Sequence, residues 1–186
     1  SAVVRALLLR VDADPYRDAV RDAVLANDEA KRVELTERKA ALEQPPEFVA
    51  FLGEYGDTPV GWRRQLLQAA LSQRPENLSL LMTLGLTYST NQNVADEGRW
   101  WFQAAVAAAP ANAAAYNNLG SALSELNKHS EAIVCFEEAI RLEPNSPEGY
   151  NGLGVALGAN RQSDEALAAF RRALALKPDF AQGHTN

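Results

Sequence analysis

The stretch Tyr-Asn-Asn-Leu-Gly at residues 116–120 decides the fold, because it returns 34 residues later as Tyr-Asn-Gly-Leu-Gly at residues 150–154. A second pattern follows each copy: a small residue, an aromatic residue four positions on, an alanine three positions after that, and then a proline. This pattern begins at Ala132 and again at Ala166, with the same 34-residue step. A fixed step of this length indicates a stack of similar units rather than a single closed core.

Each unit is typical of two helices joined by a turn. Glycine in the first helix, as at Gly120, lets the second helix approach closely, because a Cβ would hold the two backbones apart. In the second helix, steps of four and then three residues from Ala132 place the small, aromatic and alanine side chains on one face. The closing proline, as at Pro144, ends the helix because proline has no backbone N–H to donate.

The pattern extends upstream of these two units. From Gly85 to Gly120 the step is 35 residues, so one extra residue is expected, most naturally in 89–93, where the residue types favour a turn. Farther upstream, the segments 49–53 and 62–71 predict a degenerate helix pair, with Leu67 and Ala70 at inward positions. Two further helices are predicted at 15–26 and 28–43, the first beginning with an aspartate cap and a proline.

The combined pattern resembles the tetratricopeptide repeat, strongly over residues 78–180 and weakly over 46–77. The resemblance implies an all-α fold, a right-handed α-solenoid of helix-turn-helix repeats with irregular N-terminal helical pairs. The predicted segments are an N-terminal helical segment at 1–45, a degenerate pair at 46–77, a repeat with a one-residue insertion at 78–112, repeats at 113–146 and 147–180, and the truncated start of a further repeat at 181–186. We therefore expect the natural chain to continue.

In the tetratricopeptide family, the concave surface is lined mainly by the first helix of each repeat, and it binds an extended peptide or a helix of a partner protein. The resemblance assigns the second, fifth, sixth, ninth, twelfth and thirteenth repeat positions to this surface. The candidate binding residues at these positions are Met82, Thr83, Leu86, Asn117, Asn118, Ser121, Ser124, Glu125, Glu148, Asn151 and Val155. We expect a protein or peptide ligand, bound with micromolar affinity, because the surface is mixed and shallow.

Asparagine is prominent among the candidates, and an amide both donates and accepts hydrogen bonds. Asn117, Asn118 and Asn151 either hold the main chain of a peptide or cap and solvate the helices. Asn118 and Asn186 resemble the asparagine ladder of some peptide-binding arrays, which Gly152 interrupts. No lysine occupies the fifth position of a first helix, so the carboxylate clamp of chaperone-tail-binding members of the family is not expected.

Composition and charge exclude several classes of function. The net charge of −6 argues against nucleic acid and anionic lipid as partners, since both need a cationic surface. No apolar run approaches the roughly 18 residues that a membrane span needs. Cys135 is the only cysteine, so it forms no disulfide within the chain, and we interpret it as a packed thiol. We predict a cytoplasmic location.

Catalytic and metal-binding constellations are missing from the sequence. The only histidines, His129 and His184, have no nearby cysteine or histidine that would complete a zinc site. We therefore predict no enzyme activity, no metal and no cofactor for this chain.

Residues 1–75 also resemble the helical region that precedes the repeats in some bacterial eukaryote-type serine/threonine kinases. The resembling segments are Asp-Ala-Asp-Pro-Tyr-Arg-Asp at 12–18, Gln-Pro-Pro-Glu at 44–47 and the helix end at 74–75. This resemblance implies an alternative function, the regulatory or substrate-recruiting tail of a larger signalling enzyme. The chain itself has neither the His-Arg-Asp catalytic loop nor the Asp-Phe-Gly metal site of a kinase.

Two features outside the candidate set leave alternatives open. Trp100 and Trp101 point about 100° apart on a helix, so they cannot face one way. They either pack against a neighbouring helix or form an exposed interaction site on the convex side. The predicted 163–176 helix has an apolar face that no later helix covers, so self-association through this helix is a further expectation.

Overall fold

The computed structural model describes residues 14–26, 28–36, 39–54, 59–88 and 95–177. These described residues form helices and connecting turns, with no β-strand among them. The chain divides into two compact units: unit 1 is Ser1–Pro75, and unit 2 is Glu76–Asn186.

The described helices of unit 1 are α2 (Pro15–Leu25), α3 (Glu29–Thr36), α4 (Lys39–Leu42), α5 (Pro46–Glu54) and α6 (Val60–Gln73). The Oδ1 atom of Asp14 caps α2 by accepting a hydrogen bond from the backbone N–H of Arg17 at 2.8 Å. The hydroxyl of Tyr16 donates to the carbonyl oxygen of Leu35 at 2.8 Å. Its ring also packs edge-on against Phe48, with 6.4 Å between the ring centroids. One tyrosine therefore connects α2 with α3 and α5. The segment expected as one helix over 28–43 is described as α3 and α4.

The α5–α6 hairpin corresponds in position to the degenerate pair. Gly53 of α5 lies directly against Leu67 of α6: a Cβ on Gly53 would come 2.8 Å from both terminal carbons of Leu67. Leu67 and Ala70 are fully buried. The two helices thus pack through a glycine and a large apolar side chain, as the sequence predicts for the inward positions.

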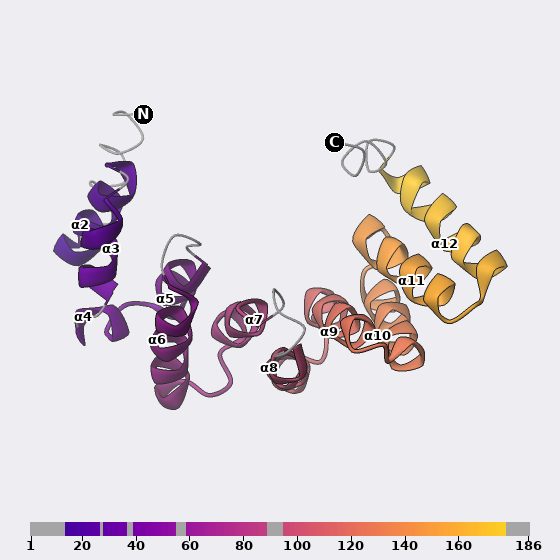
Figure 1. Cartoon of the computed structure of the whole chain (residues 1–186), viewed down its shortest axis with the longest axis horizontal. Helices are drawn as coiled ribbons and strands as arrows, with labels where there is room; N and C mark the ends of the chain where they lie inside the picture. The colour runs from indigo at the N-terminus through magenta and orange to yellow at the C-terminus, as the bar shows by residue number, and fades with distance from the viewer. Residues whose placement is uncertain (1–13, 27, 37–38, 55–58, 89–94, 178–186) are drawn as a thin grey trace. The chain divides into compact units, whose positions relative to one another are not determined.

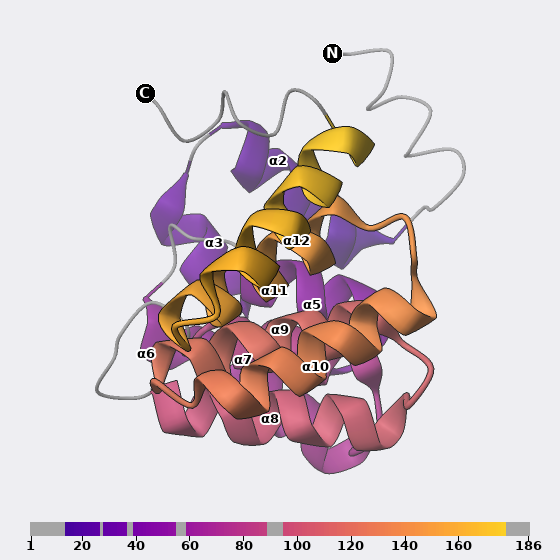
Figure 2. The ribbon, with the colours of Figure 1, turned by 90° about the vertical axis from the view of Figure 1, so that its right-hand side faces the viewer.

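Unit 2 contains, in its described part, three helix pairs: α7 (Leu78–Leu86) with α8 (Ala95–Ala108), α9 (Ala113–Glu125) with α10 (His129–Leu142), and α11 (Pro147–Ala159) with α12 (Ser163–Leu176). Each of these helices contacts the next, and α9 also contacts α11. The hairpins follow one another in chain order (Figures 1 and 2).

The first helix of every pair in unit 2 begins with a side-chain cap. Asn77, Asn112 and Ser146 each accept a hydrogen bond from the backbone N–H three residues on, at 3.0, 2.9 and 3.4 Å. Each cap satisfies a donor that the first turn of a helix leaves without a partner. A capping residue at the same position of each repeat therefore marks where α7, α9 and α11 start.

The turns inside the second and third pairs share one backbone geometry. Asn127 and Arg161, 34 residues apart, have φ values of 59° and 65°, in the left-handed region. In both turns the next backbone N–H donates to the carbonyl oxygen five residues earlier, at 2.9 Å, which is the Schellman end of a helix. Asparagine adopts this conformation more readily than arginine, so the third pair carries more local strain.

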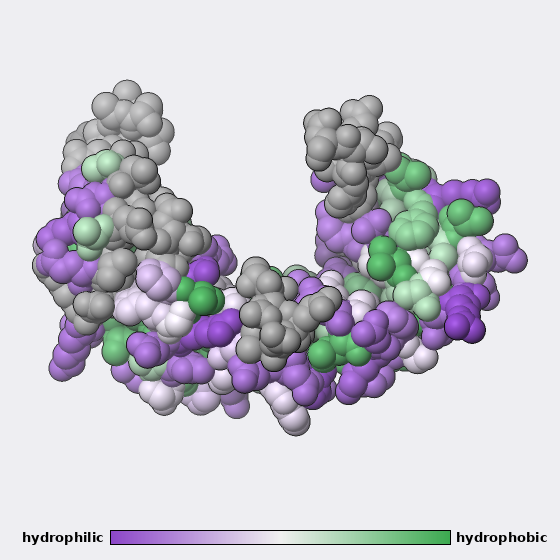
Figure 3. All heavy atoms as spheres, viewed as in Figure 1, coloured by the Kyte–Doolittle hydropathy of each residue, from purple (hydrophilic) through white to green (hydrophobic). Residues whose placement is uncertain are grey.

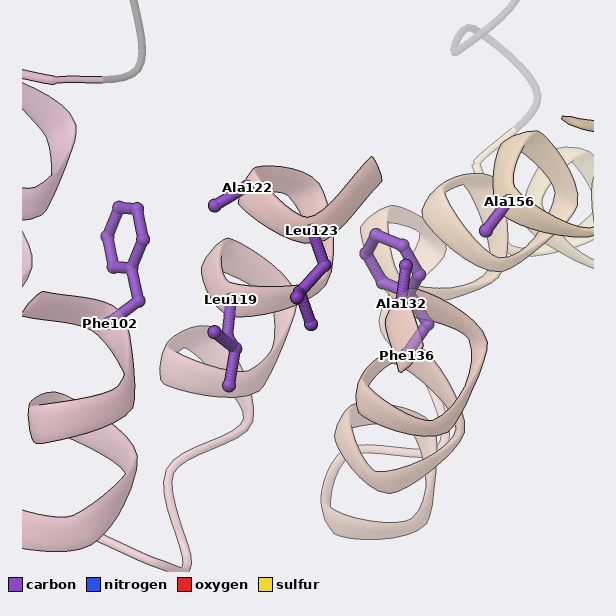
Figure 4. Packing of buried hydrophobic residues seen from close by; sticks show 7 residues of the cluster. All are labelled: Phe102, Leu119, Ala122, Leu123, Ala132, Phe136 and Ala156. Atoms are coloured by element: carbon purple, nitrogen blue, oxygen red, sulfur yellow. The ribbon is translucent and has the colours of Figure 1, made fainter. Parts of the chain in front are cut away.

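The core of unit 2 is built from phenylalanine packed on glycine. Phe102, Phe136 and Phe170 lie against the first-helix glycine of their own pair, where an added Cβ would come within 2.6, 2.9 and 2.7 Å of the ring. Phe136 also lies against Gly152 of the next pair, where a Cβ would come 2.3 Å from Cε1. Figure 4 shows Phe136 between the leucines of α9 and Ala156 of α11. One ring therefore packs two successive repeats together.

Candidate functional site

The candidate binding residues lie on α7, α9 and α11, the first helices of the three pairs in unit 2. These helices lie along one side of unit 2, with α8, α10 and α12 along the other (Figure 1). We call the surface formed by the eleven candidate residues the first-helix face.

The candidates differ in how far they reach the solvent. Leu86 and Val155 are 46% and 51% exposed, although both are large and apolar. Thr83 is buried, at 3% exposure, so its side chain contributes nothing to the outer surface. The exposed polar candidates are Ser121, Glu125 and Glu148, and the half-buried ones are Met82, Asn117, Asn118, Ser124 and Asn151.

Two of the candidate asparagines lie between neighbouring first helices. The Nδ2 atom of Asn118 donates to the sulfur of Met82 at 3.9 Å, which links α9 to α7. The Oδ1 atom of Asn117 lies close to Gly149 of α11, 3.5 Å from where a glycine Cβ would stand. That oxygen is buried and has no hydrogen-bond partner among the described residues. The amides thus lie at the junctions of α7, α9 and α11. The sequence offered two roles for them, holding the main chain of a peptide or capping and solvating the helices, and neither role includes this position.

Packing accounts for the glycine that interrupts the asparagine pattern. Gly152 occupies the repeat position of Asn118, and its missing Cβ makes room for the ring of Phe136. A side chain at this point of α11 would enter the core between two repeats. The interruption therefore has a structural cause, and Asn186, the other member of the proposed ladder, lies outside the described residues.

The charged residues of the first-helix face are both acidic. Partial burial raises the pKa of the Glu125 carboxyl, because a charged carboxylate loses solvation there. The carboxylate of Glu148 accepts a hydrogen bond from the hydroxyl of Ser146 at 3.2 Å. The set contains no lysine or arginine, so its formal charge is negative.

Apolar side chains also reach the surface elsewhere in unit 2. Trp100 is 62% exposed, and the guanidinium of Arg99 lies 4.7 Å from the centroid of its ring; Trp101 is half-buried. Hydrophobic surface is visible over α11 and α12 (Figure 3). On α12, Leu167 and Leu174 are 52% and 41% exposed. An interaction through Trp100 and self-association through α12 remain predictions.

Neither a metal site nor a membrane span is found among the described residues. No group of three or more histidine, cysteine, aspartate or glutamate residues is arranged there to hold a metal ion. None of the described helices has the length and apolar character needed to cross a membrane.

Burial, together with the negative charge of Glu131, raises the pKa of the Cys135 thiol to about 11, so the thiolate is scarce at neutral pH.

Solved structures of MamA share this fold. MamA MSR-1 matches with a TM-score of 0.65 and 27% identity, over 88% of this chain and 95% of that chain. Another MamA crystal structure gives a TM-score of 0.72 at 21% identity, over 92% of this chain and 94% of that one. MamA 41-end from Desulfovibrio magneticus RS-1 gives 0.70 at 20% identity, over 92% and 96%. A search of curated proteins found no match.

The resemblance of residues 1–75 to a kinase-associated region finds no support in these comparisons. The matches to MamA structures extend over about nine tenths of this chain, so they include most of unit 1 as well as unit 2. Most of the region that resembles the kinase-associated segment therefore lies within the match to the MamA structures.

Family models identify the repeats directly. One tetratricopeptide repeat model matches residues 113–146 and 147–180, and a second matches residues 64–113. Together they cover more than half of the chain. The predicted fold class is confirmed: an all-α, right-handed α-solenoid of helix-turn-helix repeats. The chain is a protein–protein interaction module, and it belongs to the tetratricopeptide repeat family.

Proposed function

We propose that unit 2 binds an extended peptide, or a segment of a partner protein, across the first-helix face. The observation that carries this proposal is the contrast between the eighth and ninth repeat positions. The eighth residue is always a glycine buried against a second-helix phenylalanine. The ninth is always exposed, at Leu86, Ser121 and Val155. One side of each first helix therefore holds the repeat together, and the other stays accessible.

Contacts between the first helices support the same proposal. The Asn118–Met82 hydrogen bond joins α9 to α7, and α9 packs directly on α11. A surface whose helices are already held in place loses little conformational entropy when a ligand binds. The contacts on offer are small, so we expect a micromolar dissociation constant for a single peptide.

The proposal is tested by selecting random dodecapeptides against the full chain and measuring the selected peptides by calorimetry. Ser121→Arg places a long cationic side chain in the middle of the first-helix face, and we expect it to weaken binding at least tenfold. Ser130→Arg is the matched control, because Ser130 is exposed on α10, outside the lining helices. Binding that survives Ser121→Arg, or that Ser130→Arg weakens as much as Ser121→Arg does, would overturn the proposal.

A further inference from the structure

The ninth repeat positions form a row with a regular chemical pattern. Leu86, Ser121 and Val155 lie on three successive first helices and read apolar, polar, apolar. The two apolar members are about half exposed. The hydroxyl of Ser121 already donates to the backbone oxygen of Asn117 at 3.0 Å, so its own oxygen is left to accept. A ligand that crosses this row meets a hydrogen-bond acceptor in the middle and one apolar contact on each side of it.

The spacing of the two apolar contacts selects the spacing of the ligand's side chains. The first helices are neighbours, α7 and α9 through the Asn118–Met82 hydrogen bond and α9 and α11 through direct packing. With about 8–10 Å between neighbouring helix axes, two steps from α7 to α11 cover about 16–20 Å. An extended chain advances about 3.3 Å per residue, which makes this distance about five to six residues. Side chains of an extended chain alternate between two faces, so two side chains that point the same way are an even number of residues apart. Six residues satisfy both conditions.

Charge selects what lies between the two apolar side chains. Glu125 follows Ser121 by four residues on α9, so the two lie on the same helix face. Partial burial already raises the pKa of this carboxyl, and a nearby cation would stabilise its charged form. A lysine or arginine on the ligand, opposite the centre of the row, would supply that cation.

From this row we propose that the first-helix face recognises an extended segment with two large apolar side chains six residues apart and a lysine or arginine between them on the same side. This inference rests on the proposed function and names the class of ligand for it.

The heptapeptide Leu-Ser-Lys-Ser-Lys-Ser-Leu, acetylated and amidated, carries this pattern and serves as the probe for calorimetry with the full chain. The matched control, Leu-Ser-Lys-Ser-Lys-Leu-Ser, has the same composition, but its second leucine faces the other way. We expect the control to bind about fivefold more weakly, since it loses most of one apolar contact. Replacing both lysines of the probe with glutamates should weaken binding at least fivefold at low salt. Equal binding by all three peptides would overturn the inference.

Variants of the protein test the same contacts from the other side. Leu86→Ser and Val155→Ser should each weaken binding of the probe about fivefold, and each should reduce the difference between probe and control. Leu167→Ser is the matched control, because Leu167 is as exposed as Val155 but lies on α12. Glu125→Gln should weaken binding of the probe about threefold, because an attraction is lost, and should strengthen binding of the glutamate peptide, because a repulsion is lost. An effect of Leu167→Ser equal to that of Val155→Ser would refute the assignment of the row.

The outcomes separate this inference from the proposed function. Selected dodecapeptides that bind the first-helix face without the six-residue spacing would refute the inference and leave the proposed function standing. Bound peptides that turn helical by circular dichroism would refute the extended ligand, because a helix advances only about 1.5 Å per residue. If neither the library nor the heptapeptides bind, both proposals fail.

Discussion

The α5–α6 hairpin of unit 1 and the α9–α10 hairpin of unit 2 use the same contact in different ways. In each, a glycine of the first helix lies under a large apolar side chain of the second, Leu67 in one case and Phe136 in the other. Leu67 meets Gly53 of its own hairpin. Phe136 meets Gly120 of its own hairpin and Gly152 of the next. The glycine contact thus closes a hairpin in both units, and Phe136, by reaching a second glycine, also packs its repeat on the next one.

The largest effect that tests this comparison is expected from Phe136→Ala. Removing a ring that is 3% exposed leaves a cavity facing two helices, and we expect the free energy of unfolding of unit 2 to fall by about 4 kcal/mol. Leu67→Ala should cost about 2–3 kcal/mol, because only one hairpin loses its contact. Urea unfolding followed by circular dichroism measures both. Equal costs would contradict the role of Phe136 in joining two repeats.

The next largest effect is expected from Gly152→Ala. Its Cβ would come 2.3 Å from the Phe136 ring, so we expect a loss of about 3 kcal/mol from overpacking. In a Phe136→Ala background the same change should cost nothing, because the ring is gone. Gly158→Ala is the control in the same helix: its Cβ would meet only Ala166 at 3.9 Å, so helix propensity should stabilise it by about 0.5–1 kcal/mol. Additive costs in the double variant would refute the contact.

Gly53→Ala tests the unit 1 contact and should cost less, about 1–2 kcal/mol. The Cβ would press on the terminal carbons of Leu67, which rotate about side-chain bonds, whereas the ring of Phe136 is held from two sides. The measurement is urea unfolding, with Gly61→Ala as the control, since nothing lies within 4 Å of a Cβ there. A cost as large as that of Gly152→Ala would show that Leu67 is held as firmly as Phe136.

The smallest effect compares two turns of unit 2. Arg161→Gly should raise the stability by about 1 kcal/mol, because glycine adopts a φ of 65° without steric cost. Asn127→Gly should change stability by less, since asparagine already tolerates its φ of 59°. Thermal unfolding of the two variants checks the order. A larger gain for Asn127→Gly would contradict the strain assigned to Arg161.

The sequence predicted the fold class because the repeat step and the glycine–aromatic spacing depend only on which residues face each other along one chain. It also predicted that Leu67 and Ala70 lie at inward positions of the degenerate pair, and both are fully buried. These features are local to a hairpin, and a pattern of 34 residues contains them completely.

The finer features of the first-helix face depend on contacts between repeats, which spacing alone does not reveal. Thr83 occupies a position expected to bind a ligand, yet it is buried. Asn118 sits at the same position one repeat on, but its amide contacts Met82. Gly152, at that position again, receives the ring of Phe136. These outcomes depend on which side chain of a neighbouring repeat lies against the position, Met82 in one case and Phe136 in another, and a single repeat does not contain that side chain.

The position of Phe136 between two glycines has a consequence for dividing the array into fragments. A fragment that stops after α10 would keep the phenylalanine and lose Gly152, leaving one side of the ring in water. A fragment that begins at α11 would keep the glycine and lose the ring that covers it. Truncation series should therefore be cut so that α10 and α11 stay together, even though the sequence period places its boundary between them.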